Sequence, residues 1–535
     1  MDPPDDINAP TSAPFDKSIS DDANLENLGY EQELHRSFSL LGMIGFSFSI
    51  VTCWSALGGT LIVGIVSGGP QVMIYAWIGV SLFSLAVAYS FAEMCSAYPV
   101  AGGQYSWVAV LAPSRWARGM SWVTGWFMLV GLIANGAVNN FIAANFILGM
   151  ANLANPDYVI ERWHTVVITY FIILTVGNVN IFAPRAMNKI TQIILVWNIV
   201  SFLVIVITMV ATKTEKQTPS FVFQEFRNDT GLSAPLGVIA GLLQTFYSMC
   251  CYDAPAHMTE EMRNASQDAP KAIVAAVGLG AVTGFCFLIA AYFCIGDIDA
   301  VANSSTGVPL IQIIYDCTGS VAGTCFLSSL ITVILLVCAN SIMAEGSRAL
   351  WAFARDNGLP YSKVISSVNK KFQVPVVAII VCMVIQAALN TIYIGTYTGF
   401  NTVISIAAEG FYVSYAIPLL SRLMSHFSGA PVRLQGGHYS LGRWGVPLNI
   451  IGAVYLLFAA VTFNFPSAGP IDSENMNYCS AAVGLVMLIS AVTWFTGGRK
   501  SFTMPLLDGP VPATMGESSE RSLEKDAVGA DGKNK

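Results

Sequence analysis

The stretch TCWSALGG at residues 52–59 interrupts the first long apolar segment of the chain, and SMCCYDAP at residues 248–255 interrupts the sixth. Gly58 and Gly59 each cost about 1 kcal/mol inside a helix, and Pro255 removes a backbone donor and clashes with the preceding turn. Interruptions at corresponding positions of two halves are typical of an inverted repeat, in which unwound backbone lines a cavity near the membrane midplane. We therefore predict a binding site between two broken helices. The alternative is that the glycines only allow close helix packing.

Around these runs the chain is long and apolar. It has 535 residues, of which 54% are hydrophobic and 11% charged, whereas soluble domains carry about 25% charged residues. A spanning helix needs about 20 mostly apolar residues. Twelve such segments lie near residues 40–66, 71–96, 117–150, 164–182, 190–211, 235–256, 272–296, 320–346, 374–394, 400–421, 445–465 and 478–496. The alternating strands of a membrane barrel are absent, so we predict an all-α polytopic protein with twelve transmembrane helices.

Several functional classes are excluded by what the sequence lacks. The net charge of -7 provides no basic surface for nucleic acid. No CxxC, HExxH or histidine cluster indicates a metal, and no Walker loop indicates ATP, so we expect no metal and no cofactor. A nucleophile–base constellation is also missing, which argues against an enzyme. Repeated carbonyl motifs, typical of channel filters, do not occur either.

The basic residues indicate the orientation. If the N-terminus is cytosolic, all but four of the 26 Lys and Arg residues fall on the inside, and the exceptions are Arg162, Lys213, Lys216 and Arg227. This asymmetry predicts that both termini are cytosolic. The sequons at Asn228 and Asn303 then lie outside, where they are either glycosylated or unused.

Five motifs together resemble one transporter family. They are AEM at 92–94 with YPVAGGQY at 98–105, YDAPAHMTEE at 252–261, SRALWAFARDNGLP at 347–360, VP at 374–375 and SYAIP at 414–418. The set resembles the amino acid–polyamine–organocation transporters, and the second motif resembles the fungal amino acid/choline branch. The resemblance covers roughly residues 36–500. It implies a 5+5 inverted-repeat core plus two extra helices, and secondary active transport of amino acids, choline or related amines.

This architecture divides the chain into six parts. They are a disordered acidic cytosolic tail (1–38), a first repeat (39–211), an extracellular loop (212–234), a second repeat (235–424), two further helices (425–498) and a disordered cytosolic tail (499–535). We expect an integral membrane protein surrounded by lipid in the fungal plasma membrane. The vacuolar or another internal membrane is the alternative.

The two interrupted runs supply the candidate binding residues. The residues that we expect to bind substrate are Thr52, Cys53, Trp54, Ser55 and Ala56 in the first run and Ser248, Met249, Cys250, Cys251 and Tyr252 in the second. Freed backbone N–H groups suit a carboxylate, and freed carbonyl groups suit an amine or a cation.

Three further residues are candidates for gating or coupling. By resemblance, Tyr247 stands where relatives place a bulky aromatic residue over the substrate, and Asp253 where an acidic residue shapes the gate. Ordinary packing and helix capping are the alternatives. Glu409 is an intramembrane carboxylate, which by default indicates a function: it holds a substrate amine, carries a proton or makes a structural hydrogen bond. Asn198 occupies the place of a titratable lysine in some relatives, so proton coupling would need Glu409, Asp253 or another carboxylate.

Two other carboxylates are predicted to be structural. Glu93 lies near the inner end of its helix, where it can pair with a basic loop residue. Glu345 precedes Arg348 by three residues, which places both on one helix face. We expect Glu345 and Arg348 to pair as a structural latch.

A substrate small enough for the space between two broken helices is predicted. A site with N–H groups on one side and carbonyl groups on the other favours a zwitterion such as 4-aminobutyrate or a neutral amino acid, with a proton as the expected coupling ion. Choline is the alternative and would need an aromatic cage, to which Trp54, Tyr247, Tyr252 and Phe411 could contribute. Polyamines and thiamine-like cations are less favoured. A non-transporting nutrient receptor is a remote alternative, because the chain after Lys500 is short and polar.

Overall fold

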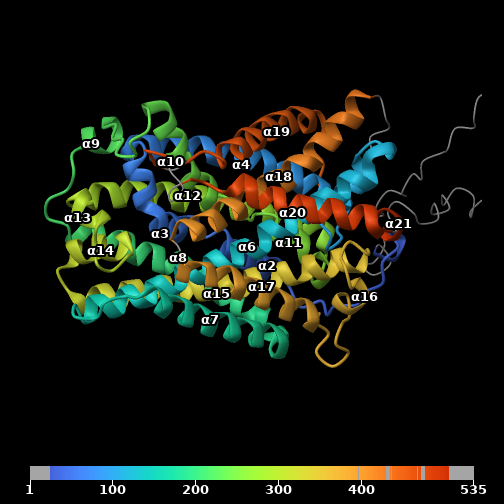
Figure 1. The fold of residues 1–535 in the computed structure, drawn as a ribbon, viewed down its shortest axis with the longest axis horizontal. Coiled ribbons are helices and arrows are strands. Elements are labelled where there is room, and N and C mark those ends of the chain that lie inside the picture. Colours follow the sequence, from blue (N-terminus) through green and yellow to red (C-terminus); the bar gives the residue numbers. More distant parts are fainter. Residues whose placement is uncertain are drawn as a thin grey trace, which may run out of the picture.

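The computed structural model of the protein describes residues 25–395, 397–428, 434, 437–466, 468–471 and 476–504. Within these residues nearly all regular structure is helical, and only isolated β-bridges occur. The long helices run along the long axis of the molecule (Figure 1). The outer parts of the two predicted tails, residues 1–24 and 505–535, lie outside the described residues.

The helices that the text refers to have the following bounds. They are α2 (Leu40–Ile50), α3 (Cys53–Val66), α4 (Gly69–Ala97), α5 (Gln104–Leu111), α6 (Ser114–Ala154), α7 (Arg162–Phe182), α8 (Met187–Thr212), α9 (Pro219–Gln224), α10 (Ala234–Ser248), α11 (Ala254–His257), α12 (Ala265–Cys294), α13 (Ile298–Ala302), α14 (Pro309–Thr318), α15 (Val321–Arg355), α16 (Ser362–Ile365), α17 (Val376–Gly395), α18 (Tyr397–Phe427), α19 (Gly445–Thr462), α20 (Cys479–Thr493) and α21 (Arg499–Ser501).

Eleven helical segments of the described chain are long and apolar enough to cross a membrane. They correspond to eleven of the twelve predicted spans. The sixth predicted span is divided into α10 and α11, and α10 has only 15 residues, so it is too short to be counted with the others. The all-helical membrane fold predicted from composition is confirmed.

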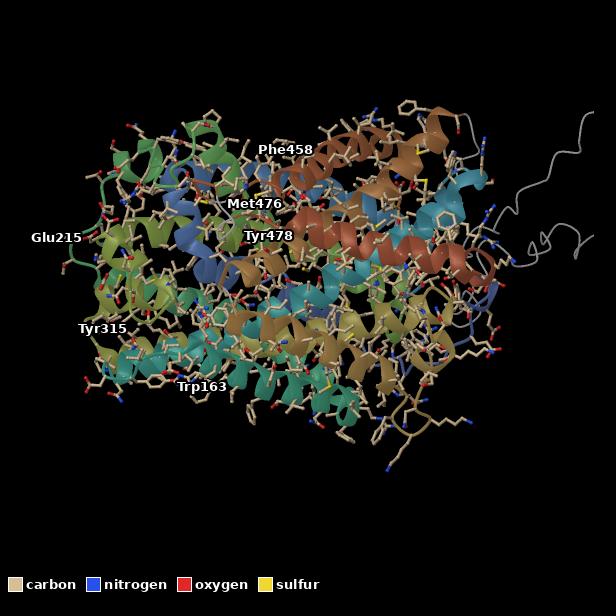
Figure 2. All side chains as sticks on the ribbon, in the orientation of Figure 1. Trp163, Glu215, Tyr315, Phe458, Met476 and Tyr478 are labelled. Carbon is tan, nitrogen blue, oxygen red and sulfur yellow. The ribbon has the colours of Figure 1, made fainter. Side chains whose placement is uncertain are left out.

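The bundle has a long flank and two ends (Figure 1). Large apolar side chains are exposed along the flank of the bundle, among them Leu82, Val196 and Phe458, which is labelled in Figure 2. Exposed apolar side chains on a closed helical bundle are expected where lipid replaces water. The molecule has two ends. The α14 end comprises the loops and short helices of residues 213–233 and 296–320, and the α16 end comprises residues 98–118, 254–264 and 355–375 (Figure 1).

The two interrupted segments lie against each other in opposite directions. The α3 piece packs on α10, and the α2 piece packs on α11. Helix α12 packs on both α2 and α3. Because each broken helix covers the other, the two interruptions lie within the bundle instead of at its lipid-facing surface.

Residues 25–38, part of the segment predicted as a disordered tail, are packed against the bundle in the described structure. Residues 25–38 pack on the α16 end, where Leu25, Tyr30, Leu34 and Phe38 are buried. The backbone N–H of Phe38 donates to the carbonyl of Glu261 at 3.0 Å. The average acidity of residues 1–38 concealed these spaced apolar side chains, whose burial favours order.

The C-terminal tail also begins later than predicted. Residues 499–504 are described, and they include the short helix α21. Phe502 packs edge-on against Trp122 and contacts Phe353. One aromatic side chain therefore ties the start of this tail to α6 and α15.

Candidate functional site

The first interruption is short. Helix α2 ends at Ile50 and α3 begins at Cys53, so Val51 and Thr52 alone are non-helical. The α2 piece has 11 residues and the α3 piece 14, which places the break near the middle of the segment.

The glycines that pointed to this break have a different role. Gly58 and Gly59 both lie inside α3. A Cβ atom on Gly58 would lie 2.4 Å from Cδ2 of Leu310, so the missing side chain allows α14 to approach α3. The packing alternative therefore describes these two glycines, and the chain is interrupted before them.

The second interruption is longer and lies where the sequence predicted it. Helix α10 ends at Ser248 and α11 begins at Ala254. Between them Cys251 has φ +65°, a left-handed conformation that few non-glycine residues adopt. Pro255 lies in the first turn of α11, where its missing N–H has no intrahelical partner to lose. The proline therefore starts a new helix and does not kink an existing one.

A cavity lies between the two interruptions and is closed on its other sides by α6 and α15. The residues that line it are Ile50, Thr52, Ala56, Asn135, Asn139, Ile142, Tyr247, Ser248, Cys250, Cys251, Leu335, Cys338 and Ile342. Five of the ten predicted binding residues are among them, as is Tyr247. Ser248 Oγ is buried without a hydrogen-bond partner in the described structure, so this cavity presents an unused polar group.

The other five predicted binding residues do not line this cavity. Trp54 donates its indole N–H to Oδ1 of Asn198 at 2.7 Å. Cys53 contacts the sulfur of Met249 at 3.7 Å. Ser55 and Tyr252 are likewise engaged, since Ser55 donates to a carbonyl of its own turn and Tyr252 packs on aromatic rings of α4 and α18. The three consecutive residues Cys53, Trp54 and Ser55 lie on the part of the first turn of α3 that faces away from the cavity, because a helical turn presents only part of its circumference to one side.

Two asparagines of α6 belong to the cavity and were not predicted. Asn135 accepts from the Tyr247 hydroxyl at 3.2 Å and donates to Sγ of Cys251 at 3.2 Å. Asn139 donates to the carbonyl of Leu335 at 3.1 Å. Their spacing of four residues within an apolar segment places both on one helix face. This pair of polar residues on one face of an apolar helix was the signal in the sequence that could have identified them as cavity residues.

Asp253 does not line the cavity. Its buried carboxylate accepts from the amide of Gln104 and from the hydroxyl of Tyr415, and it lies 3.1 Å from Nε2 of His257. The side chain therefore connects α11 to α5 and α18. No side-chain capping bond is made there, so the helix-capping alternative does not describe this side chain.

Glu409 is not among the residues that line the cavity. It lies on α18, and Cys479 Sγ at the start of α20 donates to its Oε2 at 2.8 Å. Since it does not line the cavity, the structural hydrogen bond is the interpretation that its surroundings favour. A substrate amine in the cavity would not reach it without rearrangement.

The expected pair of Glu345 and Arg348 is wrong. Arg348 Nε instead donates to Oε1 of Glu261 at 2.7 Å, and both side chains are buried. Neither carboxylate oxygen of Glu345 has a hydrogen-bond partner in the described part of the chain. Its carboxylate lies close to Asp253 and His257, with one potential ligand atom from each of the three within 4.8 Å of the others. The i, i+3 spacing permitted the pair, but Arg348 pairs instead with Glu261, which lies in the 3-10 turn Thr259–Glu261 after α11.

The α16 end is held by further ion pairs. Glu260 accepts two hydrogen bonds of 2.9 Å from Arg355, and Glu93 pairs with Arg422 of α18. The predicted pairing of Glu93 with a basic residue is confirmed, although its partner lies on a helix instead of a loop. The guanidinium of Arg355 also lies 4.2 Å from the centre of the Tyr30 ring. The turn Thr259–Glu261 is therefore bound to α15, and α4 is bound to α18, by compensated charges.

Asp356 closes the same end. Its Oδ2 accepts from Tyr105 at 2.9 Å and from Tyr30 at 3.2 Å. Burial raises the pKa of Asp356 to about 6, while Arg355 and the two hydroxyl donors oppose that rise. The N-terminal segment is thus bound to α15 by a group that titrates in mildly acidic conditions.

Comparisons with known proteins agree with this architecture. The family described as "Amino acid permease" matches residues 38–489. A protein of Macrophomina phaseolina named as an amino acid/polyamine transporter is 61% identical over 440 residues, which cover 82% of this chain and 97% of its own. The choline transporter of Saccharomyces cerevisiae is 32% identical over 88% of this chain and 83% of its own. The amino-acid permease BAT1 of Arabidopsis thaliana is 31% identical over 91% and 96%.

A solved structure shares the fold. The manganese transporter of Eremococcus coleocola superposes with a TM-score of 0.55 over 85% of this chain and 92% of its own, at 12% sequence identity. At that identity the likeness concerns the fold alone. The family match and the full-length relatives establish the rest: the chain belongs to the amino acid permease family, whose members are integral membrane transporters and not enzymes.

Proposed function

We propose that the protein imports a small amino acid or amine, such as 4-aminobutyrate, by alternating access and proton symport. One observation carries the proposal: two helix ends of opposite polarity face one cavity. Thr52 and Ala56 are at the start of α3, and Ser248 is at the last turn of α10. The start of a helix carries partial positive charge and its end partial negative charge. A zwitterion with its carboxylate toward α3 and its amine toward α10 matches both.

Choline is the second candidate, because one relative is named a choline transporter. A quaternary ammonium group is usually bound by several aromatic faces. Of the four aromatic residues that could form such a cage, Tyr247 lines the cavity, whereas Trp54, Tyr252 and Phe411 are not among its lining residues. The described lining therefore favours a zwitterion over choline.

We further propose that the α16 end faces the cytosol and that residues 39–211 and 235–424 are the two repeats. The distribution of basic residues supports this orientation. In the proposed fungal plasma membrane, Asn228 and Asn303 would then be extracellular. Asn303 is exposed, whereas Asn228 is half-buried and donates to Leu232 at 2.9 Å, so glycosylation is expected at Asn303 first. Epitope tags at both termini should be accessible only after permeabilisation, and an accessible N-terminal tag in intact cells would reverse the orientation.

The substrate is tested by uptake in a permease-deficient fungal strain. Radiolabelled 4-aminobutyrate, neutral amino acids and choline are supplied with and without a protonophore. We expect uptake of 4-aminobutyrate or a neutral amino acid that the protonophore abolishes. Uptake of choline alone would reject the zwitterion in favour of the second candidate.

The site is tested by filling the cavity. Ala56→Leu adds three carbon atoms to a cavity-lining position and should abolish uptake while the protein still reaches its membrane. Ala481→Leu is the matched control, because Ala481 is exposed on α20 and should leave uptake unchanged. Wild-type uptake by Ala56→Leu would exclude this cavity as the substrate site.

A further inference from the structure

Glu345 lies directly beyond the proposed substrate cavity on the side of the α16 end. Cys338 and Ile342 line the cavity. Ile342 follows Cys338 by four residues and Glu345 follows Ile342 by three, so all three lie on one face of α15. Glu345 itself is fully buried and is not part of the lining. It therefore lies one turn beyond the lining residue Ile342, outside the space that a bound amine occupies.

The neighbouring Asp253 and His257 neutralise each other. Nδ1 of His257 lies 3.0 Å from the carbonyl oxygen of Ala101, which only accepts, so Nδ1 carries a proton. Nε2 lies 3.1 Å from Oδ2 of Asp253, so a second proton lies between these two atoms. Asp253 also accepts from Gln104 and Tyr415, which stabilise it as a carboxylate. The pair therefore shares one proton and carries no net charge.

Glu345 has no such compensation. Both its oxygens are buried and lack hydrogen-bond partners in the described structure. The titratable groups that face it are Cys250, Cys251, Asp253, His257 and Cys338. The positive charge of His257 is already matched by Asp253, and Arg348, one turn further on, is bound to Glu261. A buried carboxylate without a partner is strongly unfavourable, and a bound proton removes its charge.

We propose that Glu345 carries the proton that drives transport. The inference rests on the proposed function, because a coupled proton requires a transported substrate. The Glu345 carboxylate accepts one proton from water in the cavity when the cavity is open at the α14 end. It returns that proton to water at the α16 end after the protein reorients, and no other bond is made or broken.

The α16 side of this site is closed by a specific turn. Residues 101–103 cover His257, and Gly103 has φ +56°. A Cβ atom on Gly103 would lie 2.7 Å from Cε1 of His257, so only glycine allows the turn to lie this close. The N–H of Ala101 donates to Glu260 at 3.1 Å, and Glu260 is bound to Arg355. Proton release toward this end therefore requires the turn and its ion pair to separate.

The donor set favours a proton over a metal ion. Asp253 Oδ2 and His257 Nε2 already bond to each other, and Oδ2 also accepts from Gln104. A metal ion would have to displace both bonds, and Glu345 alone would then offer free lone pairs. A stoichiometric metal ion in the purified full-length protein, detected by mass spectrometry, would overturn the proposal.

The test compares the wild type with Glu345→Gln in proteoliposomes. Gln imitates the protonated acid, so the variant should fold and still exchange radiolabelled 4-aminobutyrate across the membrane at the wild-type rate. Accumulation driven by a pH gradient should be lost, as should the acidification of the lumen that substrate uptake evokes, measured with a trapped dye. Glu409→Gln is the matched control: it alters another buried carboxylate of the membrane interior and should keep both activities.

The outcomes separate the two proposals. If the wild type exchanges none of the substrates in the panel, the proposed function fails. If exchange is normal and Glu345→Gln still accumulates substrate with the pH gradient, the proton carrier is overturned. Loss of exchange by correctly folded Glu345→Gln also overturns it, since Glu345 would then bind substrate or support the site.

Two further measurements keep the test decisive. The infrared carbonyl band of a protonated carboxylic acid should weaken in Glu345→Gln relative to the wild type, with no substrate present, and an unchanged band would contradict the proposal. If Glu345→Gln does not fold, Glu345→Asp keeps the titratable group at a different depth. It should then accumulate substrate with a displaced pH profile, and an unchanged profile would overturn the proposal.

Discussion

Glu345 and Arg348 lie one turn apart on α15, yet they belong to regions with opposite electrostatics. At the α16 end three buried acids have guanidinium partners: Glu261 has Arg348, Glu260 has Arg355 and Glu93 has Arg422. Beside the cavity, Asp253 has a histidine and Glu345 has no partner within the described structure. Compensated pairs suit a contact that must hold, whereas an uncompensated acid suits a group that must change charge.

The largest difference between the two regions should follow from removing one charge on α15. Arg348→Ala leaves Glu261 buried without its partner, which should cost about 3–5 kcal/mol and lower the thermal midpoint of the purified protein strongly. Glu345→Gln removes an unpaired acid from the same helix and should leave the midpoint unchanged or raise it. Equal losses in both variants, measured by thermal unfolding in detergent, would abolish the distinction between the regions.

The middle of the bundle and the α16 end should also differ in packing. A Cβ atom on Gly131 of α6 would lie 2.8 Å from the backbone nitrogen of Phe411, whereas one on Gly119 of the same helix would meet nothing within 4 Å. Gly131→Ala should therefore destabilise the protein by about 1–3 kcal/mol, and Gly119→Ala should be neutral or stabilising. The measurement is again the thermal midpoint, and similar values for the two variants would contradict the close approach of α6 and α18.

The pH dependence of the α16 end should depend on Asp356. Its pKa is raised to about 6 from an ordinary value of 3.8, so the folded state binds this proton more readily than the unfolded state. This contribution to stability grows as pH falls from 7 to 5, by about 1 kcal/mol, and is lost as pH rises through about 6. Asp356→Asn cannot titrate.

The measurement for Asp356 is a difference between two proteins at two pH values. The thermal midpoint of the wild type minus that of Asp356→Asn should be larger at pH 5 than at pH 7. A difference that stays constant, or that grows with pH, would show that Asp356 does not titrate as a buried acid.

The smallest effect is expected where the N-terminal segment meets the α16 end. Tyr30→Phe keeps the aromatic ring over Arg355 and removes one hydrogen bond to Asp356, which should cost about 0.5–1 kcal/mol. Tyr105 continues to donate to the same oxygen, so the loss is limited. Protease cleavage within residues 25–38 should accelerate slightly in this variant, and no acceleration would mean that the apolar contacts alone hold the segment.

Much of the fold was predictable from local properties of the sequence. Apolar length identified the spans, and the second interruption fell where Cys251 and Pro255 indicated it. The sequence located the first interruption only approximately, because Gly58 and Gly59 are as compatible with close helix packing as with unwinding. In the structure Gly58 packs against Leu310. The half of the predicted binding residues that faces away from the cavity could not be separated from the other half until the orientation of each turn was known.

Sequence alone determined the membrane class, the helical content and the presence of two interrupted segments, because hydropathy and backbone preference act over neighbouring residues. Tertiary structure alone decided which charges are paired. Arg348 pairs with Glu261, which is 87 residues away, and not with Glu345, which is three residues away. Glu409 accepts a hydrogen bond from Cys479, which is 70 residues away. A buried charge pairs with the group that packing brings within reach at the lowest desolvation cost, and that neighbour is set by how the helices pack.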